Sequence, residues 1–101
     1  MIIKERTSFE KLEIGSMTKL VVDIKQEIIA IGCELHIDCV DELIQDGSKY
    51  SSLWGANIYP DKKIDFVSLV NIRPKENNRS MEIQDEKIKE KVKNIIEKLL
   101  F

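Results

Sequence analysis

Leu20-Val21-Val22-Asp23-Ile24 and Ile28-Ile29-Ala30-Ile31 are two apolar runs dense in β-branched residues, which suit strands. We therefore favour a hairpin that turns near Lys25-Gln26. The centre of this turn has no Gly, Asn or Asp, so the hairpin signal is poor. The same stretch also fits one helix, because apolar residues recur at helical spacing and Gly32 would cap its end. The helical alternative stays open at this point.

The clearest strands lie further along the chain, at residues 54–59 and 64–72, joined through 60–63. Residues 66–70 are almost continuously apolar, which predicts a central strand. We pair the two strands with Tyr59 opposite Asp65, so that Asn57 faces Val67.

Three further segments complete the predicted elements. Residues 33–38 alternate in polarity, which predicts a strand with Leu35 and Ile37 facing the core. One or two helical turns follow at 40–44, with Asp38 as a candidate N-cap. A helix is predicted over 86–100 with Asp85 as its N-cap, because one apolar stripe runs through Ile88, Val92, Ile95, Ile96 and Leu99.

These elements predict an α+β fold. We expect an antiparallel sheet of three to five short strands, with the C-terminal amphipathic helix packed on one face. A chain of 101 residues has room for one domain, so we assign residues 1–101 to a single domain.

The composition excludes several classes of protein. Hydrophobic residues make up 43% of the chain and the formal net charge is −2, which excludes a disordered chain. No run approaches the roughly 18 apolar residues of a membrane span. A chain without a basic surplus is an unlikely nucleic-acid binder. Charge enters at once after Met1, as it does not in a signal peptide, so a soluble cytoplasmic protein is the expectation.

The first candidate site is the row Glu34, His36 and Asp38. On a strand, residues two apart point to the same face, so these three side chains would form one polar row. His36 is the only histidine, and any acid–base chemistry that needs a histidine must use it. The alternative without a functional role is a solvated or salt-bridged outer face.

The second candidate site would bind an anion. Asn71 and Arg73 share a face at the end of the predicted central strand, and Asn78 and Arg79 follow in a loop before a helix. Guanidinium groups bind phosphate or carboxylate in a bidentate manner. The alternative is a structural role, in which the arginines pair with acidic residues and the asparagines form hydrogen bonds with the loop backbone. The strand pairing brings further polar residues toward this face, so the full predicted ligand-binding set is Asn71, Arg73, Asn78, Arg79, Asp46, Ser48 and Asn57.

The cysteines suggest a metal site that we reject. The spacing Cys33-x-x-His36-x-x-Cys39 looks like a ligand set, but on a strand His36 faces away from both cysteines. Structural zinc usually needs four ligands as well. We therefore predict no metal and no cofactor, and we expect two free thiols, as is usual in a reducing compartment.

Several motifs together form a recognisable pattern. It runs through Gly32-x-Glu34-Leu35-His36-x-Asp38, Asp46-Gly47-Ser48, Leu53-Trp54-Gly55-x-Asn57-x-Tyr59-Pro60, Asn71-Ile72-Arg73-Pro74 and Asn78-Arg79-Ser80. The pattern resembles a family of small, single-domain prokaryotic proteins classed as a domain of unknown function, and it covers roughly residues 19–100. Members of that family tend to have glycine at the position of Cys33, so this chain departs from the pattern there. The resemblance implies no activity, cofactor or partner.

Two classes of function follow from these observations. The first is a non-catalytic binding module for a small anionic ligand or a protein partner, including a second copy of the chain. The alternative is a small hydrolase-like enzyme that uses His36 with the carboxylate of Glu34 or Asp38.

Overall fold

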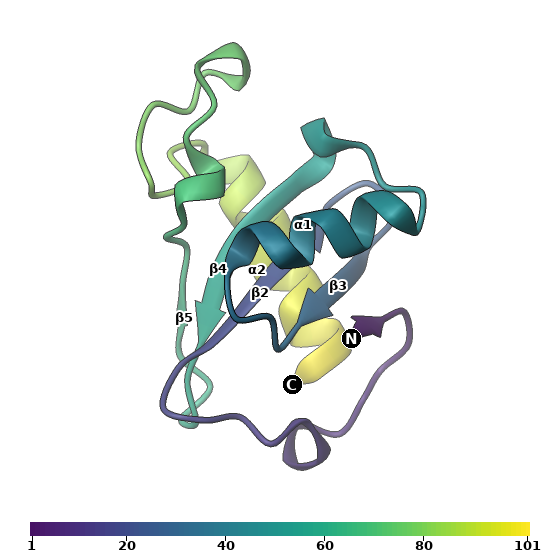
Figure 1. Cartoon of the computed structure of the whole chain (residues 1–101). Helices are drawn as coiled ribbons and strands as arrows, with labels where there is room; N and C mark the ends of the chain where they lie inside the picture. Colours follow the sequence, from purple (N-terminus) through teal and green to yellow (C-terminus); the bar gives the residue numbers. More distant parts are fainter.

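A computed structural model describes residues 1–101 and has an α+β fold, as predicted (Figure 1). Five antiparallel strands form one sheet in the order β1-β3-β2-β4-β5. Two α-helices pack on this sheet, and neither is long and apolar enough to cross a bilayer. The bounds of the elements are β1 Ile2–Ile3, β2 Thr18–Asp23, β3 Ile28–Ile31, α1 His36–Gln45, β4 Leu53–Ile58, β5 Ile64–Asp65 and α2 Glu86–Leu100.

The hairpin interpretation of residues 18–31 is correct. β2 and β3 pair antiparallel from Leu20 opposite Ile31 to Asp23 opposite Ile28. The turn needs no glycine at its centre, because Asp23 organises it from the first position. The Oδ1 atom of Asp23 accepts hydrogen bonds from the backbone N–H groups of Lys25 and Gln26, both at 2.9 Å. Such side-chain-to-backbone bonds are a common way to close a turn.

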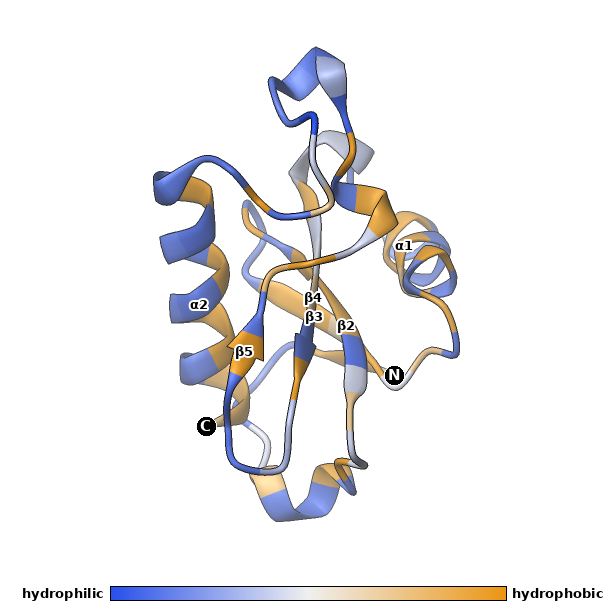
Figure 2. Cartoon of the chain, turned by 90° about the vertical axis from the view of Figure 1, so that its left-hand side faces the viewer, coloured by the Kyte–Doolittle hydropathy of each residue, from blue (hydrophilic) through white to orange (hydrophobic).

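The two helices cover opposite faces of the sheet, which makes three layers (Figure 2). Side chains alternate between the faces along each strand, so β2 sends Leu20 and Val22 to the α2 side and Val21 to the α1 side. The core under α2 is the larger one and contains Trp54. The smaller core under α1 is formed by Val21, Ile28, Ala30, Cys39, Val40, Leu43 and Leu53.

The C-terminal helix has the predicted bounds and cap. Asp85 is the N-cap of α2, and its Oδ1 atom accepts from the N–H groups of Lys87 at 2.8 Å and Ile88 at 3.4 Å. The predicted stripe is buried at Val92, Ile95, Ile96 and Leu99, while the opposite face of the helix stays charged and exposed. Periodicity therefore identified this layer correctly.

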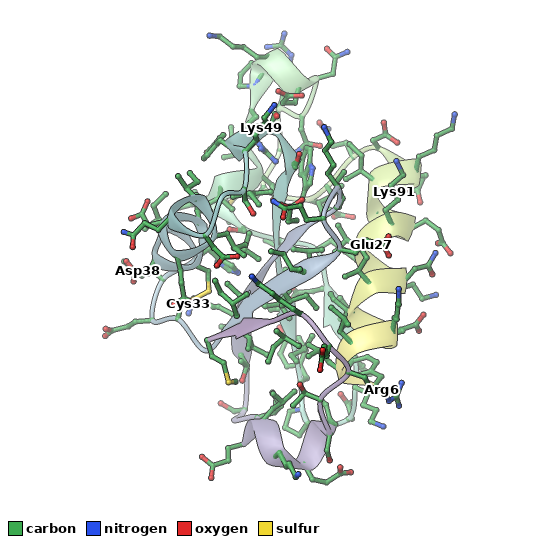
Figure 3. The ribbon with its side chains drawn as sticks, turned by 90° about the vertical axis from the view of Figure 1, so that its right-hand side faces the viewer. Arg6, Glu27, Cys33, Asp38, Lys49 and Lys91 are labelled. Carbon is green, nitrogen blue, oxygen red and sulfur yellow. A yellow bond between two sulfur atoms is a disulfide. The ribbon has the colours of Figure 1, made fainter.

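The predicted strand at residues 33–38 is wrong. Gly32, at φ +83°, turns the chain at the end of β3, and α1 begins at His36. The N-cap is Leu35 and not Asp38, which lies within the first turn and accepts from the Leu35 N–H at 3.3 Å. The cysteines are also not free, because Cys33 and Cys39 form a disulfide across this turn (Figure 3).

The predicted central strand at 64–72 is also wrong. β5 has two residues and is an edge strand, and it pairs Asn57 with Asp65, two positions away from the expected register. The chain then leaves the ladder and forms a short 3-10 helix, Leu69–Asn71. The apolar run reflects packing of this irregular segment against β4 and α1, and not a place within the sheet.

Candidate functional site

A half-open groove lies on the α1 side of the sheet, between the first turn of α1 and residues 67–70. Its volume is about 370 Å³. The segment that follows β5 crosses β4 toward α1 (Figure 2), and its residues 67–70 form one wall of the groove. The groove is lined by Met17, Lys19, Leu35, His36, Ile37, Asn57, Val67, Ser68, Leu69, Val70 and Met81.

A glycine in β4 allows the wall formed by residues 67–70 to approach the strand closely. A Cβ atom at Gly55 would lie 2.6 Å from Cβ of Ser68 and 2.9 Å from Cγ2 of Val70. No side chain fits at this position of β4 without displacing residues 68–70. Gly55 therefore allows residues 68–70, which form one wall of the groove, to pack directly against β4.

The groove gathers much of the exposed apolar surface of the molecule. Nine large hydrophobic side chains are exposed, and five of them line this groove. Leu69 is 72% exposed and Leu35 is 57% exposed, so both project from the rim. The other three are Met17, Ile37 and Met81. Contiguous exposed apolar patches mark interaction sites or ligand-binding grooves, whereas single exposed apolar side chains are normal.

The floor of the groove carries a nearly buried amide. Asn57 is 6% exposed, and its Nδ2 donates to Oδ1 of Asp65 at 2.6 Å and to the carbonyl of Val67 at 3.0 Å. Its Oδ1 atom is buried without a hydrogen-bond partner. Tyr59 donates its hydroxyl to the other carboxylate oxygen of Asp65. This hydrogen bond raises the pKa of Tyr59 and keeps its hydroxyl protonated.

His36 anchors α1 to the sheet. Its Nε2 atom lies 2.9 Å from the carbonyl oxygen of Ala56. A carbonyl only accepts, so Nε2 carries the proton and Nδ1 has a free lone pair. Burial lowers the pKa of His36, and the nearby Lys19 lowers it further, so the ring is neutral at pH 7. Lys19 is half-buried and makes no ion pair within the chain.

The structure separates the predicted polar row. Only His36 lines the groove, whereas Glu34 and Asp38 are exposed, and Asp38 lies on the outer side of α1 (Figure 3). No hydrogen bond or ion pair joins either carboxylate to His36, and Asp38 is engaged by the Leu35 N–H. On a helix, residues two apart lie about 200° apart around the axis, so His36 and Asp38 point to nearly opposite sides, and Glu34 precedes the helix.

Asn71 and Asn78, predicted to bind an anion, hold the irregular chain between β5 and α2 in place. Asn71 is fully buried and bonds both backbone groups of Gly55. Asn78 donates to the carbonyls of Asn71, Ser80 and Glu82 and accepts from the N–H of Gln84. These amides replace the ladder hydrogen bonds that a regular strand would make.

Arg73 also bonds to the backbone. Its guanidinium donates to the carbonyls of Tyr50 and Leu53, and its central carbon lies 4.0 Å from the Trp54 ring centre. No carboxylate contacts this buried cation. Burial lowers its pKa, and the carbonyl oxygens and the ring face compensate for the lost hydration.

The other predicted ligand-binding residues are engaged elsewhere or exposed. Asp46 forms an ion pair with Lys4 at 2.9 Å, and Ser48 donates to Oδ2 of Asp23 at 2.6 Å. Arg79 is exposed. No group of three or more His, Cys, Asp or Glu side chains is arranged to hold a metal ion. Of the predicted set, Asn57 alone lines the groove.

Sequence reasoning missed the apolar walls of the groove. The predicted strand at residues 33–38 puts Leu35 and Ile37 in the core, whereas the structure exposes both. On a helix that starts at His36, the buried stripe passes through Cys39, Val40 and Leu43, which leaves Ile37 off the stripe. The exposure of Ile37 was therefore predictable from the helical periodicity of residues 36–45. Nothing in the local sequence indicated that Leu69 would be exposed.

Comparison with known proteins identifies a family and no function. The model of a family described as a protein of unknown function, DUF5674, matches residues 1–99, and the chain belongs to this family. No curated protein and no solved structure matches the chain.

Proposed function

We propose that this member of the DUF5674 family is a protein-binding module that holds a segment of a partner protein in the groove between α1 and residues 67–70. The observation that carries the proposal is the convergence of five of the nine exposed large apolar side chains on one groove. Exposure of this apolar surface to water is unfavourable, and its burial is the main source of binding free energy for a partner.

The shape of the rim favours a partner protein over a small ligand. A volume of about 370 Å³ lies at the lower end for small-molecule pockets. A molecule seated inside it would leave Leu69 and Leu35 largely in water, because both project from the rim. A polypeptide segment is broad enough to fill the groove and to cover both side chains. Met17 and Met81 add flexible walls that adapt to the shape of an inserted side chain.

The polar groups define the chemistry of the expected segment. Lys19 is the only charged residue that lines the groove, and it has no partner in the chain. We expect a segment with one or two bulky apolar side chains and a neighbouring carboxylate that pairs with Lys19. Electrostatic complementarity of this kind sets orientation and specificity more than affinity.

The two other functions considered from the sequence have less support. The predicted hydrolase pairs His36 with the carboxylate of Glu34 or Asp38, but neither carboxylate contacts the ring, and Nε2 already donates to the carbonyl of Ala56. An anion site at Arg73 would compete with the two backbone carbonyls that its guanidinium bonds. Both would require rearrangement of groups that stabilise the fold.

A displayed library of short randomised peptides tests the proposal. Selection against the wild-type protein should enrich peptides that combine bulky apolar residues with Asp or Glu. Leu69→Asp should abolish their binding, whereas Ile72→Asp should retain it. Ile72 is a matched control, because it is an exposed apolar residue of the same segment that does not line the groove. Lys19→Glu should remove the preference for acidic peptides.

Other results would contradict the proposal. Peptides that bind the Leu69→Asp variant as well as the wild type would place the binding surface elsewhere. Self-association that Leu69→Asp abolishes would identify a second copy of the chain as the occupant. A small apolar probe that binds tightly, in the absence of any enriched peptide, would favour a small-molecule site.

A further inference from the structure

The disulfide encloses one wall of the groove. Cys33 and Cys39 are joined with their Cα atoms 5.7 Å apart, and they lie six positions apart in the sequence. Leu35, His36 and Ile37, the three residues that α1 and its cap contribute to the groove, all lie between them. Figure 3 shows the sulfur–sulfur bond beside the first turn of α1.

Few other contacts hold this wall. Leu35, the N-cap of α1, has no hydroxyl or carboxylate to bond the free N–H groups of the first turn. The Asp38 carboxylate reaches the Leu35 N–H at 3.3 Å, and His36 reaches the Ala56 carbonyl at 2.9 Å. Glu34, Leu35 and Ile37 are exposed, so packing adds little. Without the disulfide, His36 is the main attachment of residues 34–37 to the sheet, while the buried Cys39 and Val40 hold the part of α1 that follows.

The two sulfur positions differ in access. Cys39 is fully buried in the core under α1, whereas Cys33 is half-buried at the surface. A thiolate from a small thiol such as glutathione can therefore attack Sγ of Cys33, with Cys39 as the leaving thiolate. A second thiol then resolves the mixed disulfide. In total, two thiols are oxidised to one disulfide, and their two electrons and two protons reduce the protein bond to two cysteine thiols.

We propose that partner binding in the groove is under redox control. The partner binds tightly while the Cys33–Cys39 disulfide is intact and more weakly after the disulfide is reduced. This inference rests on the proposed function of the groove. The disulfide keeps Leu35 and Ile37 in place before binding, so the partner does not have to order them. After reduction the first turn of α1 frays, and binding must restore it.

The test measures binding of anilinonaphthalene sulfonate, an apolar probe with a negative sulfonate that suits the groove and Lys19. Its affinity is compared for the air-oxidised protein, the protein reduced with dithiothreitol, and the double variant Cys33→Ala/Cys39→Ala. Amide chemical-shift changes at Lys19 and Leu69 report whether the probe is in the groove. Dispersed amide spectra confirm that each form is folded, and a free-thiol assay confirms its redox state.

We expect the reduced protein and the double variant to bind the probe about five- to tenfold more weakly than the oxidised protein, as re-ordering of one or two side chains implies. Dithiothreitol should not change the affinity of the double variant. Equal affinity in both redox states, with Leu69→Asp still lowering it, would overturn redox control and leave the groove proposal standing. Free thiols in the air-oxidised protein would also overturn the proposal of redox control. If neither Lys19 nor Leu69 shifts in any form, redox control of this groove is overturned, and the peptide selection decides the proposed function separately.

Discussion

The side chain of Asn71 pairs with the backbone of Gly55 in the way a neighbouring strand would. Its Oδ1 accepts from the Gly55 N–H at 2.8 Å, and its Nδ2 donates to the Gly55 carbonyl at 3.0 Å. The same Nδ2 also lies 3.0 Å from the carbonyl of Met81. One amide thus replaces the part of β5 that is missing beside β4, and it ties the loop before α2 to the sheet.

Asn71→Asp is expected to destabilise the protein strongly. The variant keeps the shape of the side chain but removes the donor, and it places a negative charge against the carbonyls of Gly55 and Met81. Each buried group left unsatisfied costs about 1–3 kcal/mol, so we expect a loss of about 3 kcal/mol in the free energy of unfolding. Thermal and urea unfolding measure it. Asn94→Asp, on the exposed face of α2, is the matched control. Equal melting temperatures for the two variants would refute the role of Asn71.

Gly55→Ala tests the contact between β4 and the groove wall. The added Cβ would lie 2.6 Å from Cβ and 2.7 Å from Oγ of Ser68, so the wall must shift. Overpacking of this kind costs about 1–3 kcal/mol. Gly15→Ala is the control, because a Cβ at Gly15 meets nothing within 4 Å. Ser68→Gly in the Gly55→Ala background should recover part of the loss. If Gly55→Ala were as stable as the control, the wall would not pack as described.

The sequence predicts the parts of this fold that carry a local signal, which is helical periodicity in α2 and β-branched composition in β2 and β3. The 3.6-residue stripe of α2 and its Asp85 cap lie where they were expected, and so does the β2–β3 hairpin. The chain between β5 and α2 has no such period. Its conformation depends on Asn71 and Asn78, which bond to backbone groups of residues distant in the sequence and of the surrounding loop.

The candidate site was predictable only in part, for a related reason. The predicted site residues that line the groove are His36, chosen as the only histidine, and Asn57, chosen through the predicted strand pairing. The apolar walls of the groove were not predicted. The exposure of Leu35 follows from the helical start at His36, and the exposure of Leu69 follows from the early end of β5. Arg73 and Asn71 looked like ligand-binding residues because the same side chains that bind anions also bond to backbone.

Arg73→Met tests whether Arg73 stabilises the fold. Methionine keeps contact with Trp54 but leaves the carbonyls of Tyr50 and Leu53 without their donor. Because hydrogen bonds from a charged group contribute about 1.5–3 kcal/mol each and the variant also relieves a buried charge, we expect a net loss of about 2 kcal/mol. For a domain of this size that lowers the melting temperature by about 8–16 °C. Arg79→Met, at an exposed arginine, should change it little. An unchanged or higher melting temperature for Arg73→Met would instead indicate a residue kept for binding.

His36 should make the protein less stable as the pH falls. Its pKa in the folded state is lowered from the usual 6.5, chiefly by burial, so the unfolded chain binds a proton more readily than the folded one. The stabilisation is therefore fully present above 6.5 and is lost as the pH falls through the lower folded-state pKa. Melting temperatures measured across this range should fall more for the wild type than for His36→Gln, which retains a donor for the Ala56 carbonyl but does not titrate. A direct check is the NMR titration of this single histidine. A pKa at or above 6.5 in the folded protein would show that the ring is not buried against Ala56 as described.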